Sequence, residues 1–240
     1  MANEGDFFTE FFPSPPLLPG LENAHLYVDD KTAYFFQDPE VFEDIINVLR
    51  PGIIIEIGSW KGHSANAMAD MTKKLGLNTK IVCVDHFLGG HEHWLLPEYR
   101  QELRMEFGRP NIFYNFVANT CTRNNSDVIY PLSLPSSVAS IVIRTKGLVA
   151  DLIYIDAGHD FNDVNADISN FWPALEQGGV MFGDDYPHGP VALAVGEFAR
   201  QKELRILTKG RKWIYPPTQG FFEEFIKRGY GAAENSTNRG

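Results

Sequence analysis

Short runs of consecutive apolar residues recur along this chain and alternate with segments of helical periodicity. The clearest runs cover residues 53–58, 81–85, 151–156 and 180–185. A strand that is apolar at nearly every position must be buried on both faces, which is typical of a parallel sheet covered by helices on both sides. The sequence therefore predicts an α/β fold built on a doubly wound, mostly parallel sheet.

The remaining elements follow from the same patterns. Helices are expected over residues 39–49, 63–75, 97–107, 136–145, 164–175 and 191–201. Gly178 and Gly179 are expected to end the fifth of these helices. Further strands are expected over residues 112–118 and 128–132, and an antiparallel pair that closes the sheet over residues 204–207 and 213–215.

Shifts in composition divide the chain into three parts. Residues 1–37 are rich in aromatic residues and proline, so we expect an N-terminal extension without helix that packs on the core as a strap or lid, or joins two copies in a homo-oligomer. Residues 38–228 are expected to form the single α/β domain, and residues 229–240 a disordered tail.

Charge and composition exclude several classes of partner. The 21 Lys and Arg residues are outnumbered by 31 Asp and Glu residues, and a net charge of −10 disfavours binding to nucleic acid. No apolar run approaches the roughly 20 residues of a membrane-spanning helix. Two cysteines make no disulfide framework, and the acidic N-terminus does not resemble a secretory signal, so we expect a cytoplasmic protein.

Acidic residues follow the predicted strands at equivalent positions. Glu56 lies at the end of the first strand, Asp85 at the end of the second, Asp156 at the end of a third, and Asp184 with Asp185 at the end of a fourth. Ligands of open parallel sheets bind beyond the carboxyl ends of the strands. We therefore expect these carboxylates to line one cleft.

The glycine-rich turn after the first strand constrains the type of cofactor. Residues 56–62 read Glu-Ile-Gly-Ser-Trp-Lys-Gly, and Trp60 stands where a dinucleotide-binding turn needs its second glycine. A pyrophosphate would be obstructed there, whereas a ligand without phosphates would pass over the turn. Asp85, at the end of the next strand, is placed to accept hydrogen bonds from ribose hydroxyls.

The later acidic residues predict a metal site. Asp156, Asp184 and Asp185 end neighbouring predicted strands, and three carboxylates suit a hard cation such as Mg²⁺. His159, just beyond Asp156, is placed to take a proton from a substrate hydroxyl as general base. Alternatively, the paired aspartates cap a turn and the histidine is an exposed loop residue, but the neighbouring Asp156 favours a site.

Several motifs together resemble the small metal-dependent O-methyltransferases related to the macrolide sugar methyltransferases, including relatives named after cephalosporin hydroxylase. The matching segments are residues 56–64, 84–90, 93–94, 151–159, 172–173 and 178–186. The resemblance implies a class I methyltransferase with a Rossmann-like sheet, S-adenosylmethionine (SAM) as cofactor and Mg²⁺. It implies transfer of a methyl group to a hydroxyl of a small molecule, with a sugar or a glycosylated natural product as the expected acceptor.

The resemblance also assigns residues to these roles. It implies that Mg²⁺ binds to Asp156, Asp184 and Asp185, and that His159 is the base. His86 stands where relatives carry threonine, and residues 118–120 and Ser133 are expected near the adenine. The SAM site is expected to include Glu56, Gly58, Ser59, Trp60, Ser64, Asp85, His86, Ser133 and Asp156.

Two other classes of function remain open from the sequence. His91 and His93 with Asp85 offer the ligands of a non-haem iron oxygenase. A non-catalytic binding protein is the other alternative, and it would have its cleft blocked by the aromatic N-terminal strap.

Overall fold

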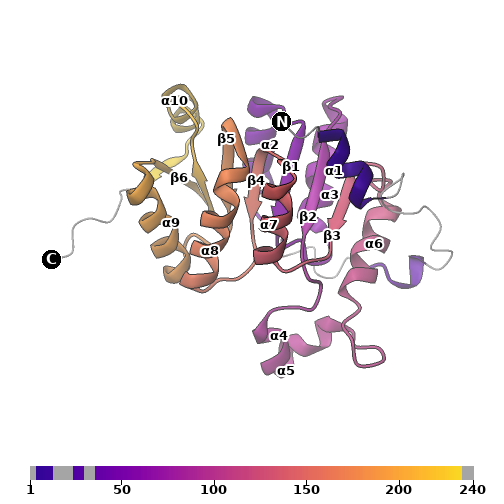
Figure 1. Cartoon of the computed structure of the whole chain (residues 1–240). Coiled ribbons are helices and arrows are strands. Elements are labelled where there is room, and N and C mark those ends of the chain that lie inside the picture. Colours follow the sequence, from indigo (N-terminus) through magenta and orange to yellow (C-terminus); the bar gives the residue numbers. More distant parts are fainter. Residues whose placement is uncertain (1–3, 13–23, 30–35, 234–240) are drawn as a thin grey trace.

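A single eight-stranded sheet organises the chain. The computed structural model describes residues 4–12, 24–29 and 36–233 (Figure 1). The strand order is β3-β2-β1-β4-β5-β7-β6-β8, in which β1 to β5 are parallel and the remaining pairs are antiparallel. The strands are β1 (Ile53–Ile57), β2 (Lys80–Val84), β3 (Ile129–Leu132), β4 (Ala150–Ile155), β5 (Leu175–Gly183), β6 (Ile206–Lys209), β7 (Lys212–Tyr215) and β8 (Gly231–Ala233). The expected doubly wound sheet with an antiparallel closing pair is confirmed.

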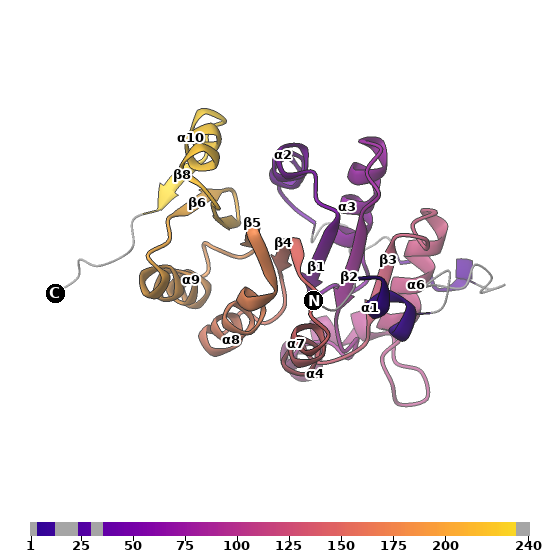
Figure 2. The same cartoon turned by 45° about the horizontal axis from the view of Figure 1, so that its top comes forward.

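Helices cover both faces of the sheet (Figures 1 and 2). One layer packs α2 (Pro39–Leu49), α3 (His63–Lys74), α6 (Ile112–Thr122) and α10 (Gln219–Lys227) against the sheet. The opposite layer consists of α7 (Ser136–Thr145), α8 (Phe161–Phe171) and α9 (Gly189–Lys202). Strand residues alternate between the two cores: Ile53 and Ile55 face the second layer and Ile54 faces the first. This double burial explains why the strands are apolar at successive positions.

The order of the strands reverses between β1 and β4, because β1 is paired with β2 on one side and β4 on the other. Loops from these strands therefore leave in opposite directions and open a crevice at the carboxyl edge. At that edge, α4 (His91–Leu95), α5 (Pro97–Arg100) and the 3₁₀ turn η3 (Gln101–Leu103) project from the sheet between β2 and α6 (Figure 1). The fold thus places the predicted acidic strand ends at the same edge of the sheet.

Three predictions about the middle of the chain are wrong. The helix expected over residues 97–107 is only the short helix α5 and the 3₁₀ turn η3, which ends at Leu103. Residues 112–118 form the start of α6 rather than a strand, and residues 115–120 are all buried. A helix that is buried around its circumference gives the same apolar run as a strand, so periodicity does not separate the two. Gly178 and Gly179 lie within β5, because the preceding helix already ends at Phe171 and a 3₁₀ turn, η4 (Trp172–Ala174), follows it.

The two ends of the chain also differ from expectation. Residues 4–11 form a helix, α1 (Glu4–Phe11), since the prolines that disfavour a helix begin only at Pro13. Residues 231–233 form β8, which pairs with β6, rather than belonging to a disordered tail. The rest of that predicted tail, residues 234–240, and residues 13–23 and 30–35 of the N-terminal extension lie outside the described residues.

Helix α1 packs against the sheet through its phenylalanines. Phe7 and Phe8 are buried, and the rings of Phe8 and Phe12 lie 4.7 and 5.2 Å from the ring of Tyr130 in the edge strand β3. The described start of the N-terminal extension therefore packs on its own chain, at one edge of the sheet.

Neither a disulfide nor a membrane span is found in the described parts of the chain. Cys83 is buried and Cys121 partly buried, and both are free thiols. Among the described residues, no helix has both the length and the apolar character that crossing a bilayer requires.

A buried ion pair joins the N-terminal segment to the turn after β1. Lys61 Nζ lies 2.8 Å from Asp29 Oδ2, and both side chains are almost fully buried. Arg104 NH2 lies 3.2 Å from Asp29 Oδ1, and the side-chain amide of Asn119 donates to Lys61 O at 2.9 Å. The segment that includes the 3₁₀ turn η1 (Ala24–Leu26) is thereby fixed to the glycine-rich turn.

We expect Asp29→Asn to destabilise the protein by about 3–5 kcal/mol, because it leaves the buried Lys61 ammonium without its counter-charge. The double variant Asp29→Asn with Lys61→Met removes both charges and should recover most of that loss. Urea unfolding of the wild type and these variants measures the effect. A single variant as stable as the wild type would show that this pair does not hold the turn.

Candidate active site

The turn between β1 and α3 lies against the backbone at the end of β4. Gly58 has a φ of +88°, and its N–H donates to Val84 O at 2.9 Å. A Cβ at this position would lie 2.0 Å from Asp156 O. Only glycine allows this approach, which brings the ends of β1, β2 and β4 together.

Asp85 fixes the shape of this turn. One carboxylate oxygen accepts a hydrogen bond from Trp60 N at 2.8 Å, and the other accepts one from Phe87 N at 2.6 Å. Trp60 has a φ of +49°, a left-handed conformation that is unfavourable for a large side chain and that this bond helps to maintain. Burial raises the pKa of Asp85.

A second buried carboxylate lies at the base of the turn. Ser64 Oγ donates to Glu56 Oε1 at 2.5 Å, and Glu56 is fully buried in β1. Burial is the largest cause that raises the pKa of Glu56, to about 7, while the hydrogen bond from Ser64 acts in the opposite direction. The predicted residues Glu56, Ser59 and Ser64 are therefore brought together.

The remaining predicted cofactor residues lie farther along the edge. His86 is 43% exposed, and its Nδ1 accepts a hydrogen bond from Leu88 N at 3.0 Å. Ser133 is exposed just beyond the end of β3. Residues 118–120, which were expected to end a strand, are buried within α6, where the amide of Asn119 bonds instead to Asp29 and Lys61.

The acidic residues after β4 and β5 meet at the same edge. Among the described residues, Asp156, His159 and Asp185 offer three ligand atoms that lie within 4.8 Å of one another. Tyr154 Oη donates to Asp156 Oδ2 at 2.8 Å, and His159 Nε2 lies 2.9 Å from Asp185 Oδ2. The cavity at these residues has a volume of about 10 Å³, room for roughly one water molecule.

Asp184, which was predicted to share a metal with Asp156 and Asp185, is not among the three residues whose ligand atoms converge. Lys212 Nζ lies 2.9 Å from Asp184 Oδ2, and Arg211 Nε lies 3.3 Å from Asp184 Oδ1, which also accepts a hydrogen bond from Asp185 N at 2.7 Å. Both oxygens are thus engaged by the protein. The group with metal-binding geometry contains His159 in place of Asp184.

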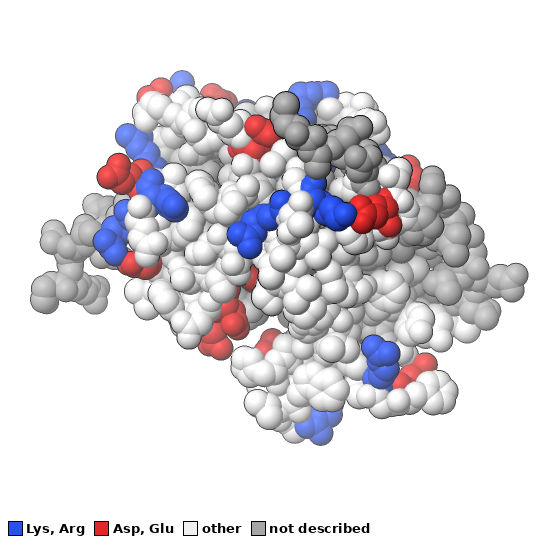
Figure 3. Space-filling view, viewed as in Figure 1, with Lys and Arg blue, Asp and Glu red and all other residues white. Residues whose placement is uncertain are grey.

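The carboxyl group of Asp156 is held in an environment that disfavours its charge. Burial is the main cause that raises its pKa to about 6, and repulsion by Asp184 adds to it, whereas Lys212 and the hydrogen bond from Tyr154 oppose the shift. A bound cation would stabilise this carboxylate. Figure 3 shows acidic side chains at the notch where the projecting α4–α5 segment meets the body of the molecule.

Three basic residues of this region were not predicted. Lys61 and Lys212 are each only 1% exposed, although lysine is rarely buried without a partner. Arg211 contacts both Asp184 and Asp185. The sequence carries one usable signal: Arg211 and Lys212 follow Gly210 in the turn of the closing hairpin, next to the edge where the acids were expected.

This geometry supports neither the non-haem iron oxygenase nor the non-catalytic binding protein. His91 is 73% exposed, the ring of His93 lies 4.4 Å from that of Trp60, and these histidines do not converge with Asp85 on a metal-binding geometry within the described ranges. The described part of the aromatic strap packs on β3 and does not line the cavity at the acids. An iron site at Asp85 and a cleft blocked by α1 are therefore both unsupported.

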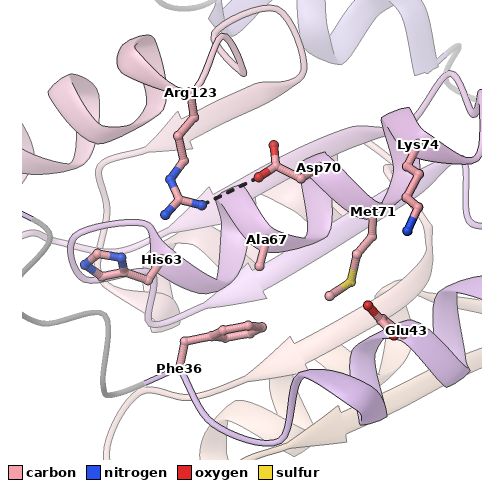
Figure 4. Close-up of a pocket in the computed structure, with 8 residues that line it drawn as sticks. All are labelled: Phe36, Glu43, His63, Ala67, Asp70, Met71, Lys74 and Arg123. Carbon is pink, nitrogen blue, oxygen red and sulfur yellow. Dashed lines mark ion pairs between the residues drawn. The ribbon is translucent and has the colours of Figure 1, made fainter.

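A larger pocket of about 330 Å³ lies between α2 and α3 (Figure 4). It combines apolar side chains such as Phe36 and Met71 with an ion pair between Asp70 and Arg123 at 3.5 Å. None of the acidic residues that follow the strands lines this pocket. The crevice at the carboxyl edge is therefore the candidate active site.

Comparison with solved structures shows the fold. The O-methyltransferase NovP is 14% identical with a TM-score of 0.54, covering 75% of this chain and 79% of that chain. CalS11, a TDP-rhamnose 3′-O-methyltransferase of calicheamicin biosynthesis, is 13% identical with a TM-score of 0.55, covering 82% and 84%. An O-methyltransferase from Bacillus cereus, solved with S-adenosylhomocysteine (SAH), is 16% identical with a TM-score of 0.53, covering 84% and 92%.

Sequence comparison shows the family. No curated protein matches the chain. A family model described as a methyltransferase domain matches residues 55–186, which is more than half of the chain and includes the end of β1, the glycine-rich turn and the acids after β4 and β5. The chain therefore belongs to the methyltransferase domain family and has the class I methyltransferase fold.

Proposed function

We propose that this protein is a SAM-dependent O-methyltransferase that acts on a hydroxyl of a small molecule. The observation that carries the proposal is that the glycine-rich turn and the acidic residues lie at the same edge of the sheet. Gly58 of this turn lies against the backbone of Asp156, one of those acidic residues. A methyl donor on the turn would thus lie beside groups that activate and position an acceptor. The match to a methyltransferase domain supports this assignment.

The turn suits the chemistry of SAM better than that of a dinucleotide. Trp60 stands where a dinucleotide-binding turn needs a glycine so that a pyrophosphate can approach, and SAM carries no pyrophosphate. Each oxygen of Asp85 accepts one backbone hydrogen bond and retains capacity for a second, which suits ribose hydroxyls. Glu56, Ser59, Ser64, His86 and Ser133 are the further cofactor contacts that we propose.

The acceptor is proposed to be a sugar or a glycosylated natural product. The basis is the resemblance of the motifs to sugar methyltransferases, and CalS11, which shares the fold, is described as acting on TDP-rhamnose. Of these acceptors, the net charge of −10 favours an uncharged glycosylated product over a nucleotide-linked sugar such as TDP-rhamnose, whose pyrophosphate is negatively charged.

His159 is proposed as the general base. Its Nε2 lies 2.9 Å from Asp185 Oδ2, so an Nε2–H would donate to that carboxylate and leave Nδ1 to accept a proton. The acceptor oxygen would then attack the sulfonium methyl in line, with SAH as the leaving group. Methyl transfer needs little else from the protein than this proton transfer and the alignment of the two substrates.

The residues present also fit Mg²⁺. Asp156 and Asp185 supply the oxygen ligands that Mg²⁺ prefers, and a cation would stabilise the partly buried carboxylate of Asp156, whose pKa is raised. When bound, Mg²⁺ would lower the pKa of an acceptor hydroxyl and orient it. Asp184 would act as a counter-ion for Lys212 rather than as a ligand.

Binding of SAH to the purified protein tests the cofactor assignment. We expect a dissociation constant in the micromolar range by calorimetry and no comparable binding of NADH. Trp60→Ala should weaken SAH binding at least tenfold, because the ring is part of the cofactor turn. Asp156→Ala should leave much of the affinity intact but abolish stimulation by metal. An equal loss of SAH affinity in both variants would contradict the assignment of Trp60 to the cofactor site and of Asp156 to the metal site.

The role of His159 is tested by the pH dependence of methyl transfer from labelled SAM to an acceptor found by screening hydroxylated sugars. His159→Ala should lower kcat about 100-fold and change the shape of the pH profile of kcat. His188→Ala, a nearby control that does not line the cavity, should leave the profile unchanged. A normal profile in His159→Ala would rule out the base.

Glu56 makes the stability of the fold depend on pH. Because its pKa is raised from 4.5 to about 7, the native state holds a proton that the unfolded chain releases between these values, and stability falls as pH rises through this window. Glu56→Gln removes this loss. Its stability relative to the wild type should rise by roughly 3 kcal/mol between pH 4 and pH 8 in urea unfolding.

The exposed Glu176→Gln serves as the control for that experiment and should show no such trend. A constant difference between Glu56→Gln and the wild type across this range would show that the Glu56 carboxylate does not retain its proton in the folded protein.

A further inference from the structure

The hairpin of β6 and β7 places two cations against the acidic crevice. Arg211 contacts the carboxylates of Asp184 and Asp185, and Lys212 Nζ lies 2.9 Å from Asp184. With Asp156, the cluster holds three carboxylates and two basic side chains. The protein therefore already supplies cations at the place where the proposed function puts Mg²⁺.

Hydrogen bonds on two sides hold the turn between β6 and β7 in place. Arg211 N donates to Asp38 Oδ2 at 2.8 Å, and Arg211 O accepts from Tyr186 N at 2.8 Å. Gly210 lies so close to Asp38 that a Cβ would be 2.2 Å from its carboxylate. These contacts hold the backbone at the start of α2 and direct the Arg211 side chain toward the acids.

The two cations differ in their freedom to move. Lys212 is only 1% exposed, and its ammonium lies 5.6 Å from the ring centroid of Phe42 and 6.0 Å from that of Tyr154. Moving it would leave a buried charge without its partner, at a cost of several kcal/mol. The Arg211 side chain is 42% exposed, so its guanidinium can turn into solvent without such a penalty.

The two carboxylate oxygens of Asp185 contact two different side chains. Oδ2 faces His159, and Oδ1 faces the Arg211 guanidinium. An arginine and a dication on one small carboxylate repel each other, and the cavity at these residues holds only about 10 Å³. A divalent ion that uses Asp185 therefore competes with Arg211.

We propose that the guanidinium of Arg211 is the counter-ion of Asp185 when no metal is bound. Arg211 must leave Asp185 before a divalent ion binds, and it thereby sets the metal affinity. The inference rests on the proposed metal site and adds a positioning residue to it. In the absence of metal, Arg211 compensates the charge of Asp184 and Asp185. Lys212 stays on Asp184 in both states.

The test is calorimetric titration of the full chain, saturated with SAH, with Mn²⁺ as the probe. Arg211→Gln should bind Mn²⁺ about tenfold more tightly than the wild type, a change of 1.4 kcal/mol. Arg211→Lys keeps the charge and should stay near the wild type. Arg205→Gln, an equal change of charge at an exposed residue just before β6, controls for net charge and should also have no effect.

The outcomes separate this proposal from the one on which it rests. Unchanged or weaker Mn²⁺ binding in Arg211→Gln, with normal binding in the wild type, would overturn the role of Arg211 alone. Failure of every form to bind Mn²⁺ while SAH still binds would overturn the metal site and this proposal with it. Loss of SAH binding in the wild type would overturn the proposed function itself.

Discussion

The close approach of two backbones at Gly58 is the constraint on which the active-site crevice depends. With no side chain at this position, the turn after β1 lies against the carbonyl of Asp156 at the end of β4. Strand order reverses at this place, so the cofactor turn and the acids that follow β4 and β5 share one small volume. A bulkier residue would separate the two halves of the proposed reaction.

Buried and partly buried carboxylates lie around this point of contact and are stabilised in different ways. Glu56 and Asp156 have raised pKa values because burial penalises their charge. Asp184 is compensated by the buried Lys212, and Asp85 accepts two backbone hydrogen bonds. A crevice built in this way attracts cations, and a sulfonium and a metal ion are both cations. The carboxylates that the fold stabilises at this edge are the groups that the proposed methyl transfer uses.

Much of this architecture could be predicted from the sequence because local patterns determine it. The fully apolar strands, the glycine at residue 58 and the acids at strand ends identify the sheet, the turn and the edge. Helix α6 could not be recognised, since burial on all sides removes its periodicity. The compensation of Asp184 by Arg211 and Lys212 joins residues about 27 positions apart through tertiary packing, and no local pattern carries it.

The two outer strands of the sheet are protected from pairing with other chains. Edge strand β3 contains Pro131, which has no N–H to donate, and α1 packs its phenylalanines on the neighbouring Tyr130. At the opposite edge, β8 is only three residues long. Short or proline-containing edges give little template for the addition of a further strand, so the sheet resists aggregation through its margins. The acidic crevice therefore lies in a sheet whose two edges disfavour the addition of strands from other chains.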